Sequence, residues 1–360
     1  MHDLTSYLTL PPYGLDRAER ERQMLAVLSQ LTAHHRANCE AYRRLLEVMG
    51  WAHPDYSRLE DVPFIPVRLF KELELRSVET QNVVKTMTSS GTSGQAVSRI
   101  FLDSATAANQ TRVLAKIVSS FIGPKRLPLL VIDSRATVRD RTLFSARGAG
   151  ILGFSMFGRE VEYALDDRMD LDLGKVSSFL ERHEGQDILL FGFTFIVWQH
   201  FVTPLLSRGV KLPLDRGCLI HGGGWKKLAE LAIDNAHFKE RLREVAGLKR
   251  SINYYGMVEQ TGSVFMECEH GNLHSSVFSD ILIRSHEDLS VLPDGEVGLV
   301  QLLSVLPGSY PGHSILTEDL GRVKGHDDCP CGRKGRYFEI LGRVKSAEVR
   351  GCSDTYAAPV

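Results

Sequence analysis

Short apolar segments that favour β-strands alternate with helix-length stretches through the middle of the chain. The strand-like segments end in glycine or polar residues and cover residues 129–133, 188–192, 218–221 and 252–255. The helix-length stretches between them include residues 172–184, 195–207 and 225–246. This alternation is typical of an α/β sheet that carries its functional residues at the ends of its strands.

The segments before this core favour helices and loops. The pattern of residues 17–49 predicts a helix, because apolar side chains recur at helical spacing among Arg and Glu. These side chains are Met24, Leu28, Leu31, Tyr42, Leu45 and Met49. A proline-punctuated stretch at 62–66, a polar loop at 86–95 and a helical segment around 105–121 follow.

The sequence after Gly271 favours β-structure. Residues 279–285, 296–305 and 336–342 alternate or run apolar between Pro-Gly-type turns, so we expect a smaller β subdomain there. The predicted organisation is a helical segment at 1–60, an α/β core at 61–270, a β-rich subdomain at 271–345 and a tail at 346–360.

Length and charge narrow the class of protein. With 360 residues the chain is long enough for about two domains. Its 43 basic and 44 acidic residues nearly cancel, so no global field attracts nucleic acid or an anionic membrane. No uncharged apolar run reaches the roughly 18 residues of a membrane span, and no signal-peptide core is present. We therefore expect a cytoplasmic protein without membrane insertion or a nucleic-acid partner.

Residues 88–95, Thr-Ser-Ser-Gly-Thr-Ser-Gly-Gln, form a loop with five hydroxyls and two glycines. Close backbone approach and many hydrogen-bond donors are properties of a polyphosphate-binding loop. The spacing and the lysine of the Walker motif are missing. A surface loop without a ligand is the alternative.

This loop resembles the phosphate loop of the adenylate-forming superfamily, which includes acyl- and aryl-CoA ligases. Four further segments resemble motifs of that superfamily in the expected order: His221-Gly222-Gly223-Gly224-Trp225, Tyr254-Tyr255-Gly256-Met257-Val258-Glu259, Thr317-Glu318-Asp319-Leu320-Gly321 and Gly342-Arg343-Val344-Lys345. Within that superfamily, nearly the whole chain most resembles the branch that contains the acyl-protein synthetases of bacterial bioluminescence. Phenylacetate-CoA ligases are the nearest relatives of that branch.

The resemblance implies an α/β fold, the N-terminal domain of an adenylate-forming enzyme, with mixed sheets, helices and a small β subdomain. Ordinary members continue after the Gly-Arg hinge as a mobile cap that supplies a catalytic lysine. Because this chain ends soon after Lys345, we expect the C-terminal cap domain to be lacking. We also expect the tail or a partner protein to take over its role, and adenylation by the chain alone to be slow.

The resemblance also implies an ATP site. The phosphate-binding residues would be Ser89, Ser90, Gly91, Thr92, Ser93 and Gly94, and the residues beside the adenine Gly222, Gly223, Gly224, Tyr255 and Gly256. Glu259 would hold Mg²⁺, Asp319 the ribose hydroxyls, and Arg343 the nucleotide. Such a site must neutralise charge, because a carboxylate that attacks the α-phosphate meets a like-charged target. Arg99 is a further cation near the loop.

Two other segments bear on the acyl group. Residues 192–198 lie where the family lines its acid pocket, although core packing is the alternative for each aromatic residue. Cys352 is the last of six cysteines, and it resembles the cysteine near the C-terminus that carries the acyl group in bioluminescence synthetases. Gly351 gives the backbone freedom and Arg350 favours the thiolate, whereas an incidental thiol is the alternative.

The remaining cysteine pattern indicates a metal. Cys329 and Cys331 stand on one turn, and Cys268 precedes two histidines. Together they can complete a tetrahedral Cys₃His zinc site, which would be structural because four protein ligands leave no open position. The spacing in some phenylacetate-CoA ligase relatives favours His274 over His270. Unliganded reduced thiols are the alternative.

These features predict an ATP- and Mg²⁺-dependent acyl-protein synthetase. It would convert a carboxylic acid, expected to be a fatty acid, into acyl-AMP and take the acyl group as a thioester on Cys352. It would then pass that group to an acyl-CoA-reductase-type partner or an acyl carrier protein. The alternatives are a ligase that acylates coenzyme A or a carrier protein, and a catalytically idle nucleotide-binding scaffold.

Overall fold

The computed structural model describes residues 4–51, 56–89, 97–139, 146–223, 228, 231 and 233–344. The described residues form two compact units. Unit 1 takes those of Met1–Ser89, Gln95–Phe121 and Tyr255–Glu348, and unit 2 takes those of Ile122–Tyr254. The domain boundaries expected from the sequence stay a prediction.

Unit 2 is built on a parallel sheet. Its strands are β4 (Leu127–Ser134), β5 (Gly158–Leu165), β6 (Ile188–Phe193), β7 (Gly217–Gly222) and β8 (Arg250–Tyr255). Their order is β5-β4-β6-β7-β8, so the direction of winding reverses between β4 and β6. The four predicted strands are confirmed. The edge strand β5 escaped prediction because its exposed Arg and Glu residues interrupt the apolar pattern.

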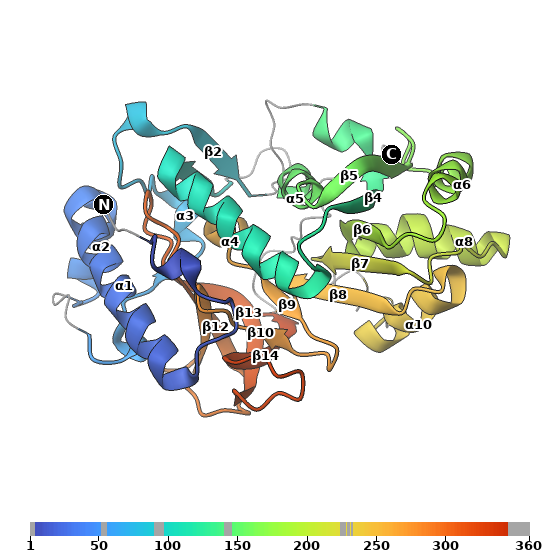
Figure 1. The fold of residues 1–360 in the computed structure, drawn as a ribbon. Helices are drawn as coiled ribbons and strands as arrows, with labels where there is room; N and C mark the ends of the chain where they lie inside the picture. Colours follow the sequence, from blue (N-terminus) through green and yellow to red (C-terminus); the bar gives the residue numbers. More distant parts are fainter. Residues whose placement is uncertain are drawn as a thin grey trace. The chain divides into compact units, whose positions relative to one another are not determined.

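Helices lie beside these strands (Figure 1). They are η4 (Arg135–Val138), α5 (Ala146–Ser155), α6 (Leu173–Arg182), α7 (Thr194–Val197), the π-helical turn η5 (Trp198–Val202), α8 (Thr203–Arg208) and α10 (Asn235–Ala246). The side chain of Asp172 caps α6 and that of Asp234 caps α10 by accepting a backbone N–H from the first turn. The predicted helix at 195–207 is therefore present as three consecutive helical pieces.

Unit 1 contains an antiparallel sheet in the order β11-β12-β13-β14-β10-β9. The strands are β9 (Phe265–Glu267), β10 (Leu273–His274), β11 (Ser279–Arg284), β12 (Gly298–Ser304), β13 (Ser314–His326) and β14 (Arg336–Arg343), and β1 (Ile65–Pro66) pairs in parallel with β13. A separate hairpin joins β2 (Lys85–Thr88) to β3 (Arg99–Leu102). The core of the antiparallel sheet includes Phe265, Ile281, Val300, Leu302 and Phe338. The three β-strands expected after Gly271 are confirmed.

The helices of unit 1 differ from the expectation at one point. They are η1 (Tyr7–Thr9), α1 (Arg17–Asn38), α2 (Glu40–Val48), η2 (Leu59–Asp61), α3 (Leu69–Glu72), η3 (Thr80–Asn82), α4 (Ser104–Ile122) and η6 (Val258–Gln260). The helix predicted at 17–49 is present as two helices, α1 and α2, because Cys39 adopts an extended conformation and divides them. The break lets Tyr42 pack edge-on against His35 and His313, while Met49 lies exposed.

No helix among the described residues combines the length and the apolar character that crossing a bilayer requires.

A buried ion-pair network joins α1 to the sheet of unit 1. The Asp280 carboxylate on β11 lies 3.1 Å from Arg20 and 2.9 Å from Arg336, and all three side chains are almost fully buried. Burial opposes ionisation of Asp280, but the two guanidinium charges lower the pKa of this carboxyl below its ordinary value. Arg336 is the first residue of β14 and Arg343 is the last. The network therefore fixes the end of β14 that is far from Arg343.

Replacement of Asp280 by Asn should lower the free energy of unfolding by about 3 kcal/mol, because two buried guanidinium groups lose their counter-ion. Urea denaturation measures the change. The wild-type advantage should persist above pH 3.8, the ordinary Asp value, and vanish as the pH falls further. Glu40→Gln removes an exposed partner of Arg44 and should leave stability unchanged. Equal stability of the two variants would contradict this account.

Candidate functional site

Asp319 lies between two other residues expected at the nucleotide. The register of β13 and β14 pairs Asp319 with Arg343, whose Nε donates to Asp319 Oδ1 over 3.0 Å. The hydroxyl of Tyr255, at the end of β8, donates to Asp319 Oδ2 over 2.6 Å. The structure thus brings together three of the residues predicted from separate motifs.

Two donated hydrogen bonds orient the Asp319 side chain. Burial and the neighbouring Asp319 charge raise the pKa of Tyr255 well above its ordinary value, so Tyr255 stays a hydrogen-bond donor. Burial opposes the charge of Arg343, but the carboxylate raises its pKa. A carboxylate has about four acceptor positions, so two remain for a vicinal diol.

Glu259 stands on η6 and is only 5% exposed. Burial raises the pKa of its carboxyl, although Ser98, Lys71 and Arg343 act in the opposite direction. The Ser98 hydroxyl is buried, and its interaction with the Glu259 carboxyl lowers the pKa of Glu259. A buried carboxylate of raised pKa is a site that a divalent cation would stabilise.

Of the Ser/Thr/Gly loop at 88–95, the structure describes Thr88 and Ser89 at its start. Ser89 follows β2 and pairs with Ser98, which precedes β3. The Ser89 N–H donates to the Ser98 carbonyl over 3.2 Å, and the Ser98 N–H donates to Ser89 Oγ over 2.9 Å. Arg99 lies opposite Thr88 and is exposed. Ser90, Gly91, Thr92, Ser93 and Gly94 lie outside the described residues.

In unit 2, the predicted glycine turn follows β7. Gly222 is the last residue of β7 and the first glycine of the turn. A Cβ at Gly222 would lie 2.6 Å from the Tyr254 carbonyl oxygen. Gly223 follows with φ of +68°, which favours glycine. His221 Nδ1 and Thr194 Oγ1, at the ends of β7 and β6, share a hydrogen bond of 2.9 Å. Gly256 belongs to unit 1, and Gly224 lies outside the described residues.

The stretch at 192–198 divides by burial. Phe193, Ile196 and Val197 are fully buried, whereas Phe195 and Trp198 are partly exposed. Phe193 packs edge-on against Phe191 at 5.9 Å between ring centroids. The acid pocket expected at this stretch stays a prediction. Cys352, the expected acyl carrier, lies outside the described residues.

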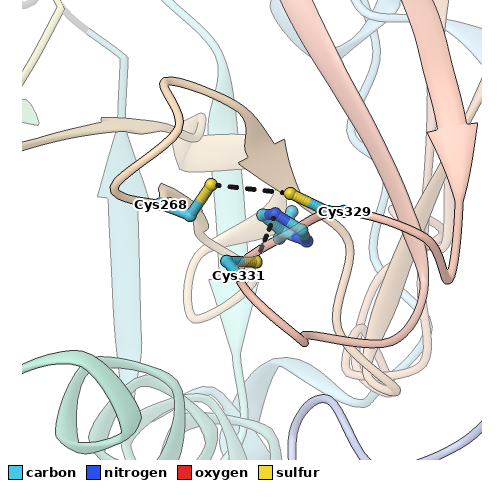
Figure 2. A group of neighbouring side chains, drawn as sticks. Cys268, Cys329 and Cys331 are labelled. Atoms are coloured by element: carbon cyan, nitrogen blue, oxygen red, sulfur yellow. Dashed lines mark hydrogen bonds between the residues drawn. The ribbon is translucent and has the colours of Figure 1, made fainter.

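The predicted metal ligands form a cluster in unit 1. The side chains of Cys268, Cys329 and Cys331 point toward one another (Figure 2). With His274, their ligand atoms all lie within 4.8 Å of one another. Cys268 directly follows β9, His274 ends β10, and the other two cysteines stand on the turn between β13 and β14. His270 is exposed on its own turn.

The dimensions of the cluster fit a tetrahedral zinc ion. Bonds of about 2.3 Å to sulfur and 2.1 Å to nitrogen imply roughly 3.8 Å between two sulfurs and 3.6 Å between sulfur and nitrogen. Cys268 Sγ lies 3.9 Å from Cys329 Sγ, and Cys331 Sγ lies 3.4 Å from His274 Nε2. Burial lowers the pKa of His274 to about 4, which keeps the imidazole in its neutral, metal-binding form.

Polar and cationic groups surround this cluster. Asn272 Nδ2 donates to Cys329 Sγ over 3.5 Å, and Lys324 Nζ donates to Asn272 Oδ1 over 2.7 Å. The Arg333 guanidinium packs over the Phe121 ring at 4.0 Å, and although burial opposes its charge, its interaction with Cys331 raises the pKa of Arg333. Three thiolates and one Zn²⁺ carry a net charge of −1, which these cations offset.

Sequence reasoning missed several residues that contact the predicted ones. Ser98 pairs with Ser89 and lowers the pKa of Glu259, but Ala96 and Val97 separate it from the hydroxyl-rich run, so the motif did not include it. Asn272 and Lys324 were missed because their contacts depend on strand pairing between distant segments. Local sequence carries no signal for such contacts.

The fold resembles that of a solved CoA ligase. An open conformation of 2-hydroxyisobutyryl-CoA ligase, solved with 2-HIB-AMP and CoA, matches with a TM-score of 0.70 at 17% identity. The match covers 96% of this chain and 81% of that one. This likeness shows the mixed α/β fold of the adenylate-forming ligases, as expected from the sequence.

Curated relatives and a family model agree on the family. The long-chain-fatty-acid–luciferin-component ligase of Aliivibrio fischeri is 24% identical over 96% of this chain and 91% of its own length. The ligase of the same name from Vibrio harveyi is 25% identical over 89% and 83%. The model of the family described as acyl-protein synthetase, LuxE, matches residues 6–359. The chain therefore belongs to the LuxE acyl-protein synthetase family of ligases.

Proposed function

We propose that this protein activates a fatty acid with ATP as acyl-AMP and then transfers the acyl group to a protein cysteine. The observation that carries the proposal is the carboxylate of Asp319, held between the Tyr255 hydroxyl and the Arg343 guanidinium, in the same unit as the buried Glu259, on whose pKa Arg343 also acts. This arrangement offers a diol acceptor, a cation for phosphate and a carboxylate for Mg²⁺ within one unit. The family and its luciferin-component ligases supply the acid class and the acceptor class.

In the first step a fatty-acid carboxylate oxygen attacks the α-phosphorus of ATP. A P–O bond to the acid forms as the bond to the β-phosphate oxygen breaks, and pyrophosphate leaves. Asp319 would hold the ribose, Arg343 would offset charge near the α-phosphate, and the serine loop from Ser89 onward would hold the outer phosphates. Mg²⁺, held by Glu259, would neutralise the charge that develops on pyrophosphate.

In the second step a thiolate attacks the acyl carbonyl carbon, a thioester forms, AMP leaves and the thiol proton passes to solvent. We assign this thiol to Cys352, from its resemblance to the acyl-carrying cysteine of bioluminescence synthetases. The acyl group would then move to an acyl-accepting protein of the acyl-CoA-reductase or carrier-protein type. We place the reaction in the cytoplasm, where the thiols of both proteins stay reduced.

Incubation of the protein with labelled fatty acid and ATP–Mg²⁺ should leave label on the chain that hydroxylamine removes, because hydroxylamine cleaves thioesters. Cys352→Ser should lose this label and keep acid-dependent pyrophosphate exchange, since only the second step is blocked. Cys39→Ala, a buried cysteine of unit 1, is the control and should label normally. Electrophoresis with autoradiography measures the label.

Each contrary outcome identifies another function. Unlabelled wild type, or unchanged label in Cys352→Ser, rules out self-acylation at this cysteine. Product that forms only with added coenzyme A or carrier protein indicates an acyl-CoA or carrier-protein ligase. Pyrophosphate exchange that is absent with every acid tested, even when the expected partner is present, indicates a nucleotide-binding scaffold.

The raised pKa of Glu259 predicts the pH dependence of adenylation. Because only the carboxylate binds Mg²⁺, exchange at low Mg²⁺ should fall on the acid side at a pH above 4.5, the ordinary Glu value. More Mg²⁺ should move this limb to lower pH, since the ion competes with the proton. Glu259→Gln should lower exchange by roughly 100-fold, whereas Glu339→Gln, on the exposed pair with Arg322, should not. An acid limb that ignores Mg²⁺ concentration would contradict the assignment.

We further propose that the Cys₃His cluster holds structural zinc. Metal analysis of untagged protein should give about one zinc per chain for the single tetrahedral site. Cys329→Ala should lose the metal and lower the melting temperature, because the turn between β13 and β14 loses its attachment to β10. Cys218→Ala is a matched control, since both cysteines are 3% exposed, and it should retain zinc. A zinc content near zero in the wild type would reject the site.

A further inference from the structure

The turn that carries Glu259 is attached to a buried segment that the proposed function does not use. This segment, residues 309–313, has the sequence Ser-Tyr-Pro-Gly-His and leads into β13. Ser309 Oγ donates to the Phe101 carbonyl on β3 over 2.8 Å, and the Ser309 carbonyl accepts from the Ser77 N–H over 2.8 Å. His313 Nε2 and Thr32 Oγ1 share a hydrogen bond of 2.9 Å. The segment is therefore fixed at both ends.

Tyr310 connects this segment to Glu259. Its side chain is fully buried, and its ring packs edge-on against Phe70 at 6.2 Å between centroids. The hydroxyl donates to the backbone carbonyl of Glu259 over 2.9 Å and accepts from Gln110 Nε2 over 3.4 Å. This buried phenol has both a donor and an acceptor partner, so its hydroxyl direction is set.

In a second contact the turn donates the hydrogen bond and the segment accepts it. Gln260 Nε2, on the residue after Glu259, donates to the carbonyl of Gly312 over 2.8 Å and to that of Leu302 over 3.2 Å. Gly312 must lack a side chain, since a Cβ there would lie 2.3 Å from the Tyr310 ring and 2.9 Å from the Glu259 carbonyl oxygen. Two residues of the turn and two of the segment are thus joined by reciprocal hydrogen bonds in close contact.

We propose that Tyr310 is a positioning residue for Glu259, and this proposal rests on the proposed function. The hydroxyl of Tyr310 fixes the backbone from which the Glu259 side chain extends, while Gln110 fixes the hydroxyl. A Mg²⁺ ligand tolerates little displacement, because Mg²⁺ demands near-octahedral geometry at about 2.1 Å. Loss of the hydroxyl should weaken Mg²⁺ binding without removing the carboxylate itself.

The test is Tyr310→Phe, which keeps the ring and removes only the hydroxyl. In acid-dependent pyrophosphate exchange, the Mg²⁺ concentration for half-maximal rate should rise about fivefold, as expected from the loss of one buried hydrogen bond. The rate at saturating Mg²⁺ and the KM for the acid should stay near wild type. Hydrogen exchange in residues 257–263 should become faster. Tyr7→Phe removes another buried hydroxyl of unit 1. It should change neither the half-maximal Mg²⁺ concentration nor the hydrogen exchange of residues 257–263.

The outcomes separate the two proposals. An active wild type with unchanged Mg²⁺ dependence in Tyr310→Phe would overturn the positioning role and leave the proposed function in place. A wild type that never shows exchange would overturn the proposed function and the role of Tyr310 with it. If Tyr310→Phe fails to fold, Gln110→Met removes only the amide that orients the hydroxyl. The same rise in half-maximal Mg²⁺ supports the proposal, and unchanged Mg²⁺ dependence overturns it.

Discussion

The pairing register of β13 and β14 is the constraint on which most of the candidate site depends. It places Asp319 opposite Arg343 at one end of the hairpin, and Gly325 opposite Tyr337 near the turn. Because side chains alternate between the faces of a strand, a slip of one residue would turn Asp319 away from both Tyr255 and Arg343. Gly325 resists such a slip, since a Cβ there would lie 2.5 Å from the Tyr337 hydroxyl.

The turn end of this hairpin is held by interactions distant in sequence. Asp280 pairs with Arg336 at the first residue of β14, and the cysteine cluster joins the turn that precedes β14 to β9 and β10. These interactions involve charged or thiol groups buried in unit 1, where removal of one partner leaves another without compensation. Stability at the turn and geometry at Asp319 are therefore properties of the same pair of strands.

Local sequence predicted those parts of the structure whose pattern is local. The strands β4, β6 and β7 of unit 2 were predictable because they are buried on both faces and their sequences are apolar runs. The strand β13 was not, because Thr317, Glu318 and Asp319 interrupt its apolar residues where the site lies. The division of the helix at Cys39 also has no local signal, as neither glycine nor proline stands there. It follows from the packing of Tyr42 against two buried histidines.

The candidate site shows the same division. Motifs indicated Tyr255, Glu259, Asp319 and Arg343 one by one, and the structure joins Tyr255, Asp319 and Arg343 through hydrogen bonds. The residues proposed to support them, such as Ser98 and Tyr310, act through tertiary contacts with segments distant in sequence. Yet a buried carboxylate such as Glu259 depends on its surroundings more than an exposed one, because desolvation penalises its charge until a cation arrives. The environment that raises its pKa is thus also one in which the proposed Mg²⁺ would stabilise the carboxylate.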